Sequence, residues 1–404
     1  MVNELEPPCD DGSCVDFVKF LRIMNLIVVR CVLKSKLVMR THTLPILATA
    51  LLALSACNNT PTPQNTIQNT PQNTATDKAP FPKYDHIFII IEENHAYDQV
   101  IGKSYTPTIN KLAQTYGIAT NYFGVVHPSE ANYVALIGGS TFGIHDDAPY
   151  NAKSNTSGNS SGVEHTITQP SLLDQLEAKG LTWKGYFEDI PSPGYKGTTY
   201  PTPTKALYAS KHNGFINFKK VQDNPQELAK LVGFDQLNAD LKSGNVPNYS
   251  HIVPNQCNEM HGLSVVCPLQ GADSDSDRKL IQQGDAIIGK IVNQIMSSSF
   301  WSSGNNAIVV TWDEDNFRQP FNQGCCGFDP KSPANFGGGH IATIIITSHG
   351  GRGVKDNTAY NHYSLLRTVE DAFGLNYLNY AGDTANGVKS MTPFFAPTAA
   401  TRVP

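Results

Sequence analysis

The chain has 404 residues, of which 40% are hydrophobic and 16% are charged. This length and composition are sufficient to bury a sizeable core in one to three domains. Its formal net charge of −5 gives no electrostatic support for a nucleic-acid partner. Composition therefore indicates a globular protein that does not bind nucleic acid, and it predicts neither a function nor an oligomeric state.

Residues 39–56 have the pattern of a bacterial lipoprotein signal peptide. A basic start at Met39-Arg40 is followed by an apolar run over residues 45–54, and Leu-Ser-Ala then precedes Cys57. The run is too short to span a bilayer, which needs about 20 residues. We expect Cys57 to carry the lipid, so that the protein is exported to the cell envelope and anchored to a membrane on its periplasmic or extracellular face. The alternative is a chance apolar stretch before a cysteine.

The rest of the chain divides around this signal. Because a signal peptide should begin near the start of translation, residues 1–38 are either an upstream artefact or an extended N-terminus. Residues 57–80 comprise Cys57 and a stretch of Asn, Gln, Thr, Pro and Ala, which cannot bury enough apolar area to fold. We predict a disordered tether there, followed by one folded domain over residues 81–404.

Four cysteines fall within the predicted domain: Cys257, Cys267, Cys325 and Cys326. In a compartment that permits disulfides, this even number indicates pairing. We favour Cys257–Cys267, with Cys325 and Cys326 either joined to each other or held close together. A zinc site built from all four is the alternative, although the spacing lacks the usual Cys-x-x-Cys pairs.

Apolar, β-branched runs alternate with helical patterns along the domain. Residues 86–91, 307–311 and 341–347 have the length and composition of buried parallel strands. Helical patterns cover residues 106–116, 171–179, 285–296 and 364–373. The alternation predicts an α/β fold, a mostly parallel central sheet with helices on both faces, in one domain with loop insertions.

Two of these runs end in oxygen-bearing side chains. Glu93 and Asn94 follow the first run, and Asp313 and Glu314 follow the second. Ligands of such sheets bind beyond the carboxyl ends of the strands, where these four side chains would meet. Carboxylate and amide oxygens are ligands for hard divalent cations, so we predict a metal site. Taken singly, each cluster could also be a solvated loop.

Ser129 stands at the head of a predicted helix, within His-Pro-Ser-Glu-Ala-Asn-Tyr over residues 127–133. A metal ion and the helix dipole can activate a serine hydroxyl at this position. Asn132, one turn later, could donate its amide to a phosphoryl oxygen. The alternative is that Ser129 only caps the helix.

Several motifs, in the right order, resemble the bacterial phosphoesterase family of acid phosphatases and phospholipases C. The first is Tyr-Asp-His-Ile-Phe-Ile-Ile-Ile-Glu-Glu-Asn over residues 84–94, and the second is Pro-Ser-x-x-Asn-Tyr over residues 128–133. Later motifs lie at residues 183–188, 211–213, 252–261, 310–314 and 361–371. The resemblance covers roughly residues 83–380. It implies an alkaline-phosphatase-like fold and makes residues 81–404 a phosphoesterase domain.

The resemblance also implies roles for individual residues. The nucleophile would be Ser129, which would form a phosphoseryl intermediate beside a divalent metal of unknown identity. The implied metal ligands are Glu93, Asn94, Ser129, Asp313, Glu314 and, by likeness to the wider group, His340. The residues implied to surround the phosphate, one histidine among them protonating the leaving oxygen, are Asn132, His212, His261 and His362. One departure bears on this set, because Glu259 replaces the usual Asp before Met-His.

A phosphomonoesterase of the acid-phosphatase type is the preferred reading, since the chain lacks the added C-terminal domain of larger phospholipases C. A phospholipase C or another phosphodiesterase is the main alternative, and no formylglycine motif of a sulfatase is evident. The substrate would be a phosphorylated small molecule or lipid. The alternative of another class is a non-catalytic binding lipoprotein on the cell surface.

Overall fold

The computed structural model describes residues 81–271, 273–327 and 337–396. The predicted signal peptide, Cys57 and the predicted tether lie outside these residues. Within them, no helix is long and apolar enough to cross a membrane.

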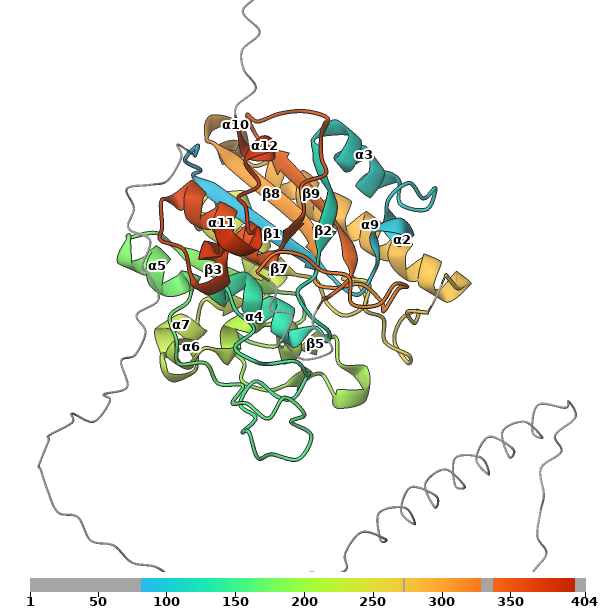
Figure 1. Cartoon of the computed structure of the whole chain (residues 1–404), viewed down its shortest axis with the longest axis vertical. Coiled ribbons are helices and arrows are strands. Elements are labelled where there is room, and N and C mark those ends of the chain that lie inside the picture. The colour runs from blue at the N-terminus through green and yellow to red at the C-terminus, as the bar shows by residue number, and fades with distance from the viewer. Residues whose placement is uncertain (1–80, 272, 328–336, 397–404) are drawn as a thin grey trace, which may run out of the picture. The chain divides into compact units, whose positions relative to one another are not determined.

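The described residues form an α/β domain around one large sheet (Figure 1). Its strands are β1 (His86–Glu92), β2 (Gly117–Phe123), β3 (Trp183–Phe187), β6 (Leu231–Val232), β7 (Tyr249–Val253), β8 (Asn306–Trp312), β9 (His340–Thr347), β10 (Val354–Asp356) and β11 (Tyr360–Asn361). The strand order is β10-β2-β9-β8-β1-β7-β3-β6, with β11 also paired to β2. A separate hairpin pairs β4 (Thr199–Tyr200) with β5 (Tyr208–Ala209).

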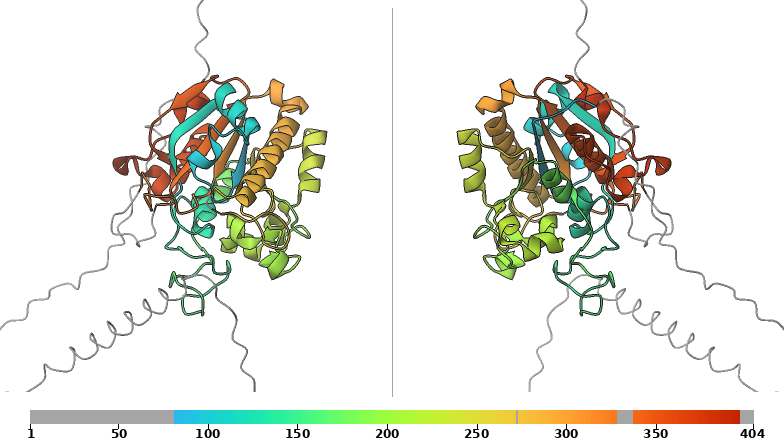
Figure 2. Two further views of the ribbon diagram at one scale, coloured as in Figure 1. Left: turned by 90° about the vertical axis from the view of Figure 1, so that its right-hand side faces the viewer. Right: turned by 90° about the vertical axis from the view of Figure 1, so that its left-hand side faces the viewer.

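The helices surround this sheet and its loops. They are α2 (Tyr97–Val100), α3 (Pro107–Thr115), α4 (Glu130–Gly138), α5 (Leu172–Ala178), α6 (Lys219–Asp223), α7 (Pro225–Leu228), α8 (Phe234–Ser243), α9 (Asp275–Met296), α10 (Ser299–Ser303), α11 (His362–Phe373) and α12 (Thr392–Phe395). Short 3-10 helices lie at η2 (Pro203–Lys205), η3 (Ser210–His212), η4 (Gly214–Asn217), η5 (Asn379–Gly382) and η6 (Thr384–Asn386). Figure 2 shows α9 and α11 on opposite sides of the sheet, as predicted for a sheet covered on both faces.

The prediction of a mostly parallel sheet is confirmed, with one correction. β9 was expected to be parallel, but it runs antiparallel to both β8 and β2. The reason lies in the connection before it. The chain leaves β8 at the carboxyl edge of the sheet and re-enters β9 at the same edge, since Thr311 is paired with Thr343 and Ala307 with Thr347.

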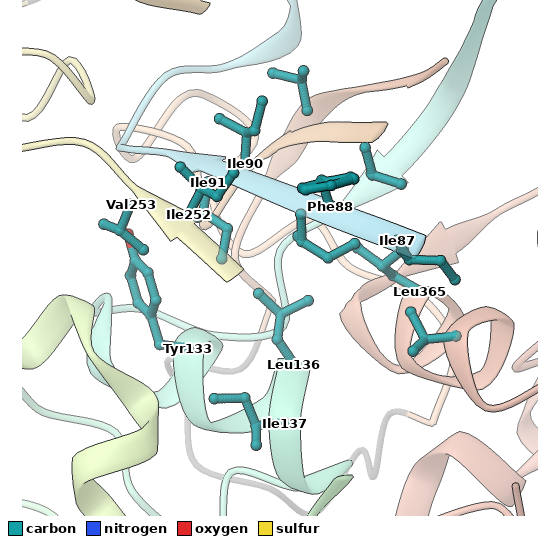
Figure 3. Close-up of a cluster of buried hydrophobic side chains, with 14 of the residues drawn as sticks. Ile87, Phe88, Ile90, Ile91, Tyr133, Leu136, Ile137, Ile252, Val253 and Leu365 are labelled. Carbon is teal, nitrogen blue, oxygen red and sulfur yellow. The ribbon is translucent and has the colours of Figure 1, made fainter. Parts of the chain in front are cut away.

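The core lies where α4 and α11 pack on β1 and β7. β1 is buried over nearly its whole length because apolar residues project from both of its faces. In Figure 3, Leu136 and Ile137 of α4 lie below β1 and β7, beside Leu365 of α11. All nine residues of α4 are buried, so the helix that follows Ser129 is enclosed by protein. The core therefore fixes the start of α4 relative to the ends of β1 and β8.

Candidate active site

The ends of β1 and β8 bring the predicted oxygen ligands together. Asp313 continues the pairing of the two strands, because its N–H donates to the Glu92 carbonyl at 3.0 Å. Asn94 adopts a left-handed conformation, φ 48°, and its N–H donates to Asp313 Oδ1 at 3.1 Å. Glu93, Asn94, Asp313 and Glu314 are all buried. The structure thus brings the Glu93–Asn94 and Asp313–Glu314 pairs together at the predicted edge of the sheet.

Ser129 lies against this group at the start of α4. Its hydroxyl makes no capping bond and instead donates to Glu93 Oε2 at 3.1 Å. The other carboxylate oxygen, Glu93 Oε1, accepts a 2.6 Å bond from the Tyr133 hydroxyl. The Ser129 hydroxyl therefore does not cap the helix. It points at one of the predicted metal ligands.

Asn132 is placed differently from the expectation. Its Oδ1 accepts the N–H groups of Val125 and Val126 at 2.9 and 3.2 Å. Its Nδ2 donates to the Val126 carbonyl at 2.7 Å and to Glu314 Oε2 at 3.1 Å. These bonds use the amide's full capacity. Asn132 holds the loop before Ser129 and orients Glu314, so it has no donor left for a phosphate.

His362 also differs from the expected role. Its Nε2 donates to the Asp313 carbonyl at 2.6 Å, and its Nδ1 accepts from the Tyr122 hydroxyl, 3.2 Å away. Burial lowers the pKa of His362 to about 4, which keeps the ring neutral. With both ring nitrogens occupied, His362 supports the backbone of Asp313 and cannot protonate a leaving group.

The structure does not bring His340 to the carboxylates. It begins β9, donates from Nε2 to the Thr120 carbonyl at 3.0 Å, and stacks on Tyr97 with 4.7 Å between ring centroids. No contact within the described ranges joins His340 to Glu93, Asp313 or Glu314. The predicted metal-ligand role of His340 therefore has no support in this geometry.

His212 and His261 adjoin Glu93 from the other side. His212 Nδ1 lies 2.7 Å from Glu259 Oε1, while its Nε2 lies 3.3 Å from Glu93 Oε1. His261 donates from Nδ1 to the Gly262 carbonyl at 3.0 Å, which leaves its Nε2 as an acceptor. Ligand atoms of Glu93, His212 and His261 lie within 4.8 Å of one another. Glu259, the departure noted in the sequence, orients His212 as carboxylates commonly orient metal-binding histidines.

Burial disfavours the charged form of both histidines. Burial, followed by the nearby Lys211 charge, lowers the pKa of His212 well below its ordinary value. The same two causes lower the pKa of His261 to about 4. A lowered pKa makes the doubly protonated ring, the form that would protonate a leaving oxygen, less populated in both. They are suited to act as hydrogen-bond acceptors or ligands.

The acidic side chains repel one another in a buried setting. Burial and the neighbouring Asp313 and Glu259 charges raise the pKa of Glu93 well above its ordinary value. Burial raises the pKa of Asp313 to about 6, and burial together with Asp313 raises that of Glu314 to about 8. So many buried carboxylates are costly without a compensating cation.

The oxygen ligands fit such a cation. Asn94 Oδ1 and Asp313 Oδ2 are buried, and neither has a hydrogen-bond partner among the described residues. The histidine group is less favourable, because the Lys211 ammonium already lies 3.4 Å from His261 Nε2. On the oxygen side of Glu93, the residues that could hold a cation are Glu93, Asn94, Ser129 and Asp313.

Sequence reasoning gave no role to several side chains at the site. His127 lies 3.0 Å from Glu314 Oε2 and 3.4 Å from Asp315 Oδ1. Although burial lowers its pKa, hydrogen bonds to Asp315 and Glu314 raise it to about 10, so these two carboxylates favour the charged form of His127. His127 belongs to the same sequence motif as Ser129, and Lys211 directly precedes His212. Both residues could therefore have been considered from those motifs.

The cysteines are paired within the described part of the chain. Cys257 and Cys267 are joined with an S–S distance of 2.03 Å, and Cys325 is bonded to Cys326. The first disulfide closes the loop that contains His261. With all four sulfurs in disulfides, the alternative of a zinc site from these cysteines is wrong.

A model of the Phosphoesterase family matches residues 103–376 of the chain. The protein belongs to this family. Membership in the Phosphoesterase family makes it a hydrolase of phosphoric esters, with the edge at Glu93, Ser129 and Asp313 as its candidate active site.

Curated relatives carry related names. A phosphatidylinositol-3-phosphatase of Mycobacterium tuberculosis is 30% identical over 302 residues, which cover 74% of this chain and 80% of the relative. A probable acid phosphatase of Kluyveromyces lactis is 27% identical over 305 residues, or 75% of this chain and 61% of the relative. A phosphate-repressible acid phosphatase of Penicillium chrysogenum is 26% identical, covering 70% and 58%. The chain thus spans less than two thirds of these two fungal relatives.

Solved structures show more distant similarity. A protein of the alkaline phosphatase superfamily from Vibrio parahaemolyticus has a TM-score of 0.46 and 14% identity, covering 74% of this chain and 68% of that one. The lipoteichoic acid synthase LtaP from Listeria monocytogenes has a TM-score of 0.44 and 12% identity, covering 77% and 78%.

Proposed function

We propose that this protein is a metal-dependent phosphomonoesterase of the acid-phosphatase type, with Ser129 as its nucleophile. The observation that carries the proposal is the Ser129 hydroxyl, which is buried, free of helix capping, and hydrogen-bonded to Glu93 beside Asp313. Ser129 Oγ would lose its proton to water and form a bond to phosphorus, while the ester P–O bond breaks and the leaving oxygen takes a proton from water. A water molecule would then attack phosphorus, break its bond to Ser129 Oγ, restore the serine hydroxyl and release inorganic phosphate.

The side chains of this protein hold the reacting serine in place. Glu93 fixes the Ser129 hydroxyl, and Tyr133 in turn fixes Glu93. The residues that would hold a divalent cation are Glu93, Asn94, Ser129 and Asp313, with Glu314 nearby. When bound, such a cation neutralises phosphoryl oxygens and lowers the pKa of the serine hydroxyl. Positioning and charge stabilisation of this kind supply most of the catalysis in phosphoryl transfer.

A direct assay tests the proposal. Purified protein is stripped of metal with a chelator, resupplied with single divalent ions, and assayed on p-nitrophenyl phosphate from acid to neutral pH. We expect turnover to be lost on stripping and restored by at least one ion. A folded protein without turnover on any phosphate ester, with every ion tried, would contradict the proposal and favour the binding-lipoprotein alternative.

The natural substrate is a separate question. The name of the mycobacterial relative makes phosphorylated inositol lipids a reasonable first class of lipid monoester to assay, alongside soluble monoesters. Phospholipase C activity stays the alternative, and bis-p-nitrophenyl phosphate and a phosphatidylcholine analogue would reveal it.

We also propose that the protein is exported and held to the envelope through Cys57. The support is the basic start, the short apolar run and the Leu-Ser-Ala-Cys ending at residues 39–57. Cells fed a labelled fatty acid should yield labelled protein, and Cys57→Ser should yield none. Equal label in both proteins, or label in neither, would contradict the anchor.

A further inference from the structure

Lys211 places a positive charge among the groups of the candidate active site. It belongs to η3, directly before His212, and its side chain is 25% exposed. Its Nζ donates to Asp147 Oδ2 at 2.8 Å and lies 3.4 Å from His261 Nε2. The ammonium is thus held at the edge of the site instead of extending into solvent.

The electrostatic effects of Lys211 reach the residues around Ser129. Its charge works against the raised pKa values of Glu93, Glu259 and Asp313. It also contributes to the lowered pKa values of His212 and His261, after burial. Lys211 therefore interacts electrostatically with acids and histidines that come from several segments of the site.

Asp147 links this lysine to the nucleophile. Its Oδ2 accepts from Lys211 Nζ, and its Oδ1 accepts the N–H of Glu130, the residue after Ser129, at 3.1 Å. One carboxylate therefore fixes the ammonium relative to the start of α4.

The segment that carries Asp147 is itself anchored. The preceding Asp146 accepts a 3.0 Å bond from the Ser160 hydroxyl, and its Oδ1 lies 3.1 Å from His165 Nε2. His165 reaches Glu130 Oε1 from its other ring nitrogen, at 3.1 Å. These contacts hold the loop over residues 146–165 against the start of α4, so the position of Lys211 is built into the fold.

We propose that Lys211 binds an unesterified oxygen of the phosphoryl group and selects monoesters over diesters. This inference rests on the proposed phosphoesterase function of the same site. A monoester carries close to two negative charges at pH 7, since its second pKa is about 6, whereas a diester carries one. A fixed ammonium in a partly buried site favours the more highly charged phosphoryl group, because each added charge interacts strongly there.

The test compares Lys211→Met with the wild type on p-nitrophenyl phosphate and bis-p-nitrophenyl phosphate. We expect kcat/KM for the monoester to fall by about 10²–10³-fold, the usual cost of one such donor. The kcat/KM for the diester should fall by less than about tenfold, because its single charge interacts more weakly with the ammonium. Lys211→Arg should recover much of the monoester preference. The matched control is Lys153→Met, an exposed lysine paired with Glu164, and it should leave both rates unchanged.

Inhibition by inorganic phosphate gives a second readout that does not depend on diester turnover. Lys211→Met should weaken this inhibition by about tenfold or more, the effect expected from losing one charge-assisted bond. Equal losses on both esters, or unchanged phosphate inhibition in a folded variant, would overturn the role of Lys211 while leaving the phosphoesterase proposal intact. A wild type without activity on any ester would instead contradict the proposed function, and with it the inference.

Discussion

Replacing Ser129 with alanine is expected to lower kcat on p-nitrophenyl phosphate by about 10⁴-fold or more, as in other enzymes that lose their nucleophile. The fold should persist, because Ser129 makes no capping bond and its hydroxyl bonds to side chains of the site itself, Glu93 and Asp313. Loss of the bond to Glu93 should cost about 1 kcal/mol of unfolding free energy. Initial rates and thermal unfolding, measured on the same preparations, separate the two effects.

A matched control and a chemical signature sharpen this result. Ser243→Ala removes an exposed hydroxyl from α8 and should retain full activity. Wild-type protein quenched in acid during turnover should carry a phosphoryl group on the peptide containing Ser129, and Ser129→Ala should carry none. If Ser129→Ala kept more than about a tenth of the wild-type rate, water rather than serine would be the nucleophile, since removing the true nucleophile is far more damaging.

The strands that the sequence predicted are those with continuous apolar runs. β1 and β8 were found within one or two residues because their side chains are buried on both faces. β7 was missed, since its sequence Tyr-Ser-His-Ile-Val places two polar residues in a fully buried strand. The predicted direction of β9 was wrong, because an apolar run carries no information about the edge at which the chain re-enters the sheet.

The start of helix α9 was also predicted incorrectly from the sequence. The sequence predicted a helix from Asp285, but α9 begins at Asp275, where the Ser274 hydroxyl accepts the Asp277 N–H at 3.1 Å. The first turns are polar and include Gly284, so they lack a continuous apolar stripe. In these first turns, Asp277 lies 3.1 Å from His95 Nε2, and this contact comes from a segment distant in sequence.

Among the site residues, those next to the ends of predicted elements could be predicted, and those whose roles depend on tertiary contacts could not. Glu93, Ser129 and Asp313 could be predicted because they directly follow a strand or begin a helix at one edge of the sheet. The roles of Asn132 and His362 could not, because each depends on bonds to backbone groups that come close only in the fold. Lys211 and Asp147 are 64 residues apart in sequence, so no local pattern pairs them.

Replacing Asp313 with asparagine is expected to change activity and stability in opposite directions. Asparagine keeps the Oδ1 acceptor that binds the N–H groups of Asn94 and Glu314. It removes the negative charge that a divalent cation would need, so we expect kcat/KM to fall by about 10²-fold or more, in line with the loss of electrostatic stabilisation. Metal-free protein should become more stable at pH 8, because one of several mutually repelling buried carboxylates has gone.

The pH dependence gives the sign of this stability change. Burial raises the pKa of Asp313 to about 6 in the folded protein, above the ordinary 3.8, so the native state binds the proton more tightly than the unfolded state does. The free energy of unfolding contributed by this group therefore falls as pH rises from about 4 to above 6, by up to roughly 3 kcal/mol. Asp313→Asn lacks this loss, so its advantage in metal-free protein should be present at pH 8 and small at pH 4.

Thermal unfolding with a chelator, and again with excess metal, tests whether Asp313 binds the cation. Metal should stabilise the wild type more than Asp313→Asn, because a ligand stabilises a fold only to the extent that it binds the native state. Asp223→Asn, an exposed carboxylate paired with Lys219, should behave like the wild type. Equal stabilisation of both proteins by metal would remove Asp313 from the ligand set. A variant that is less stable than the wild type at pH 8 without metal would show that its charge is compensated by the protein alone, and the strongest physical reason for a cation at this edge would then be gone.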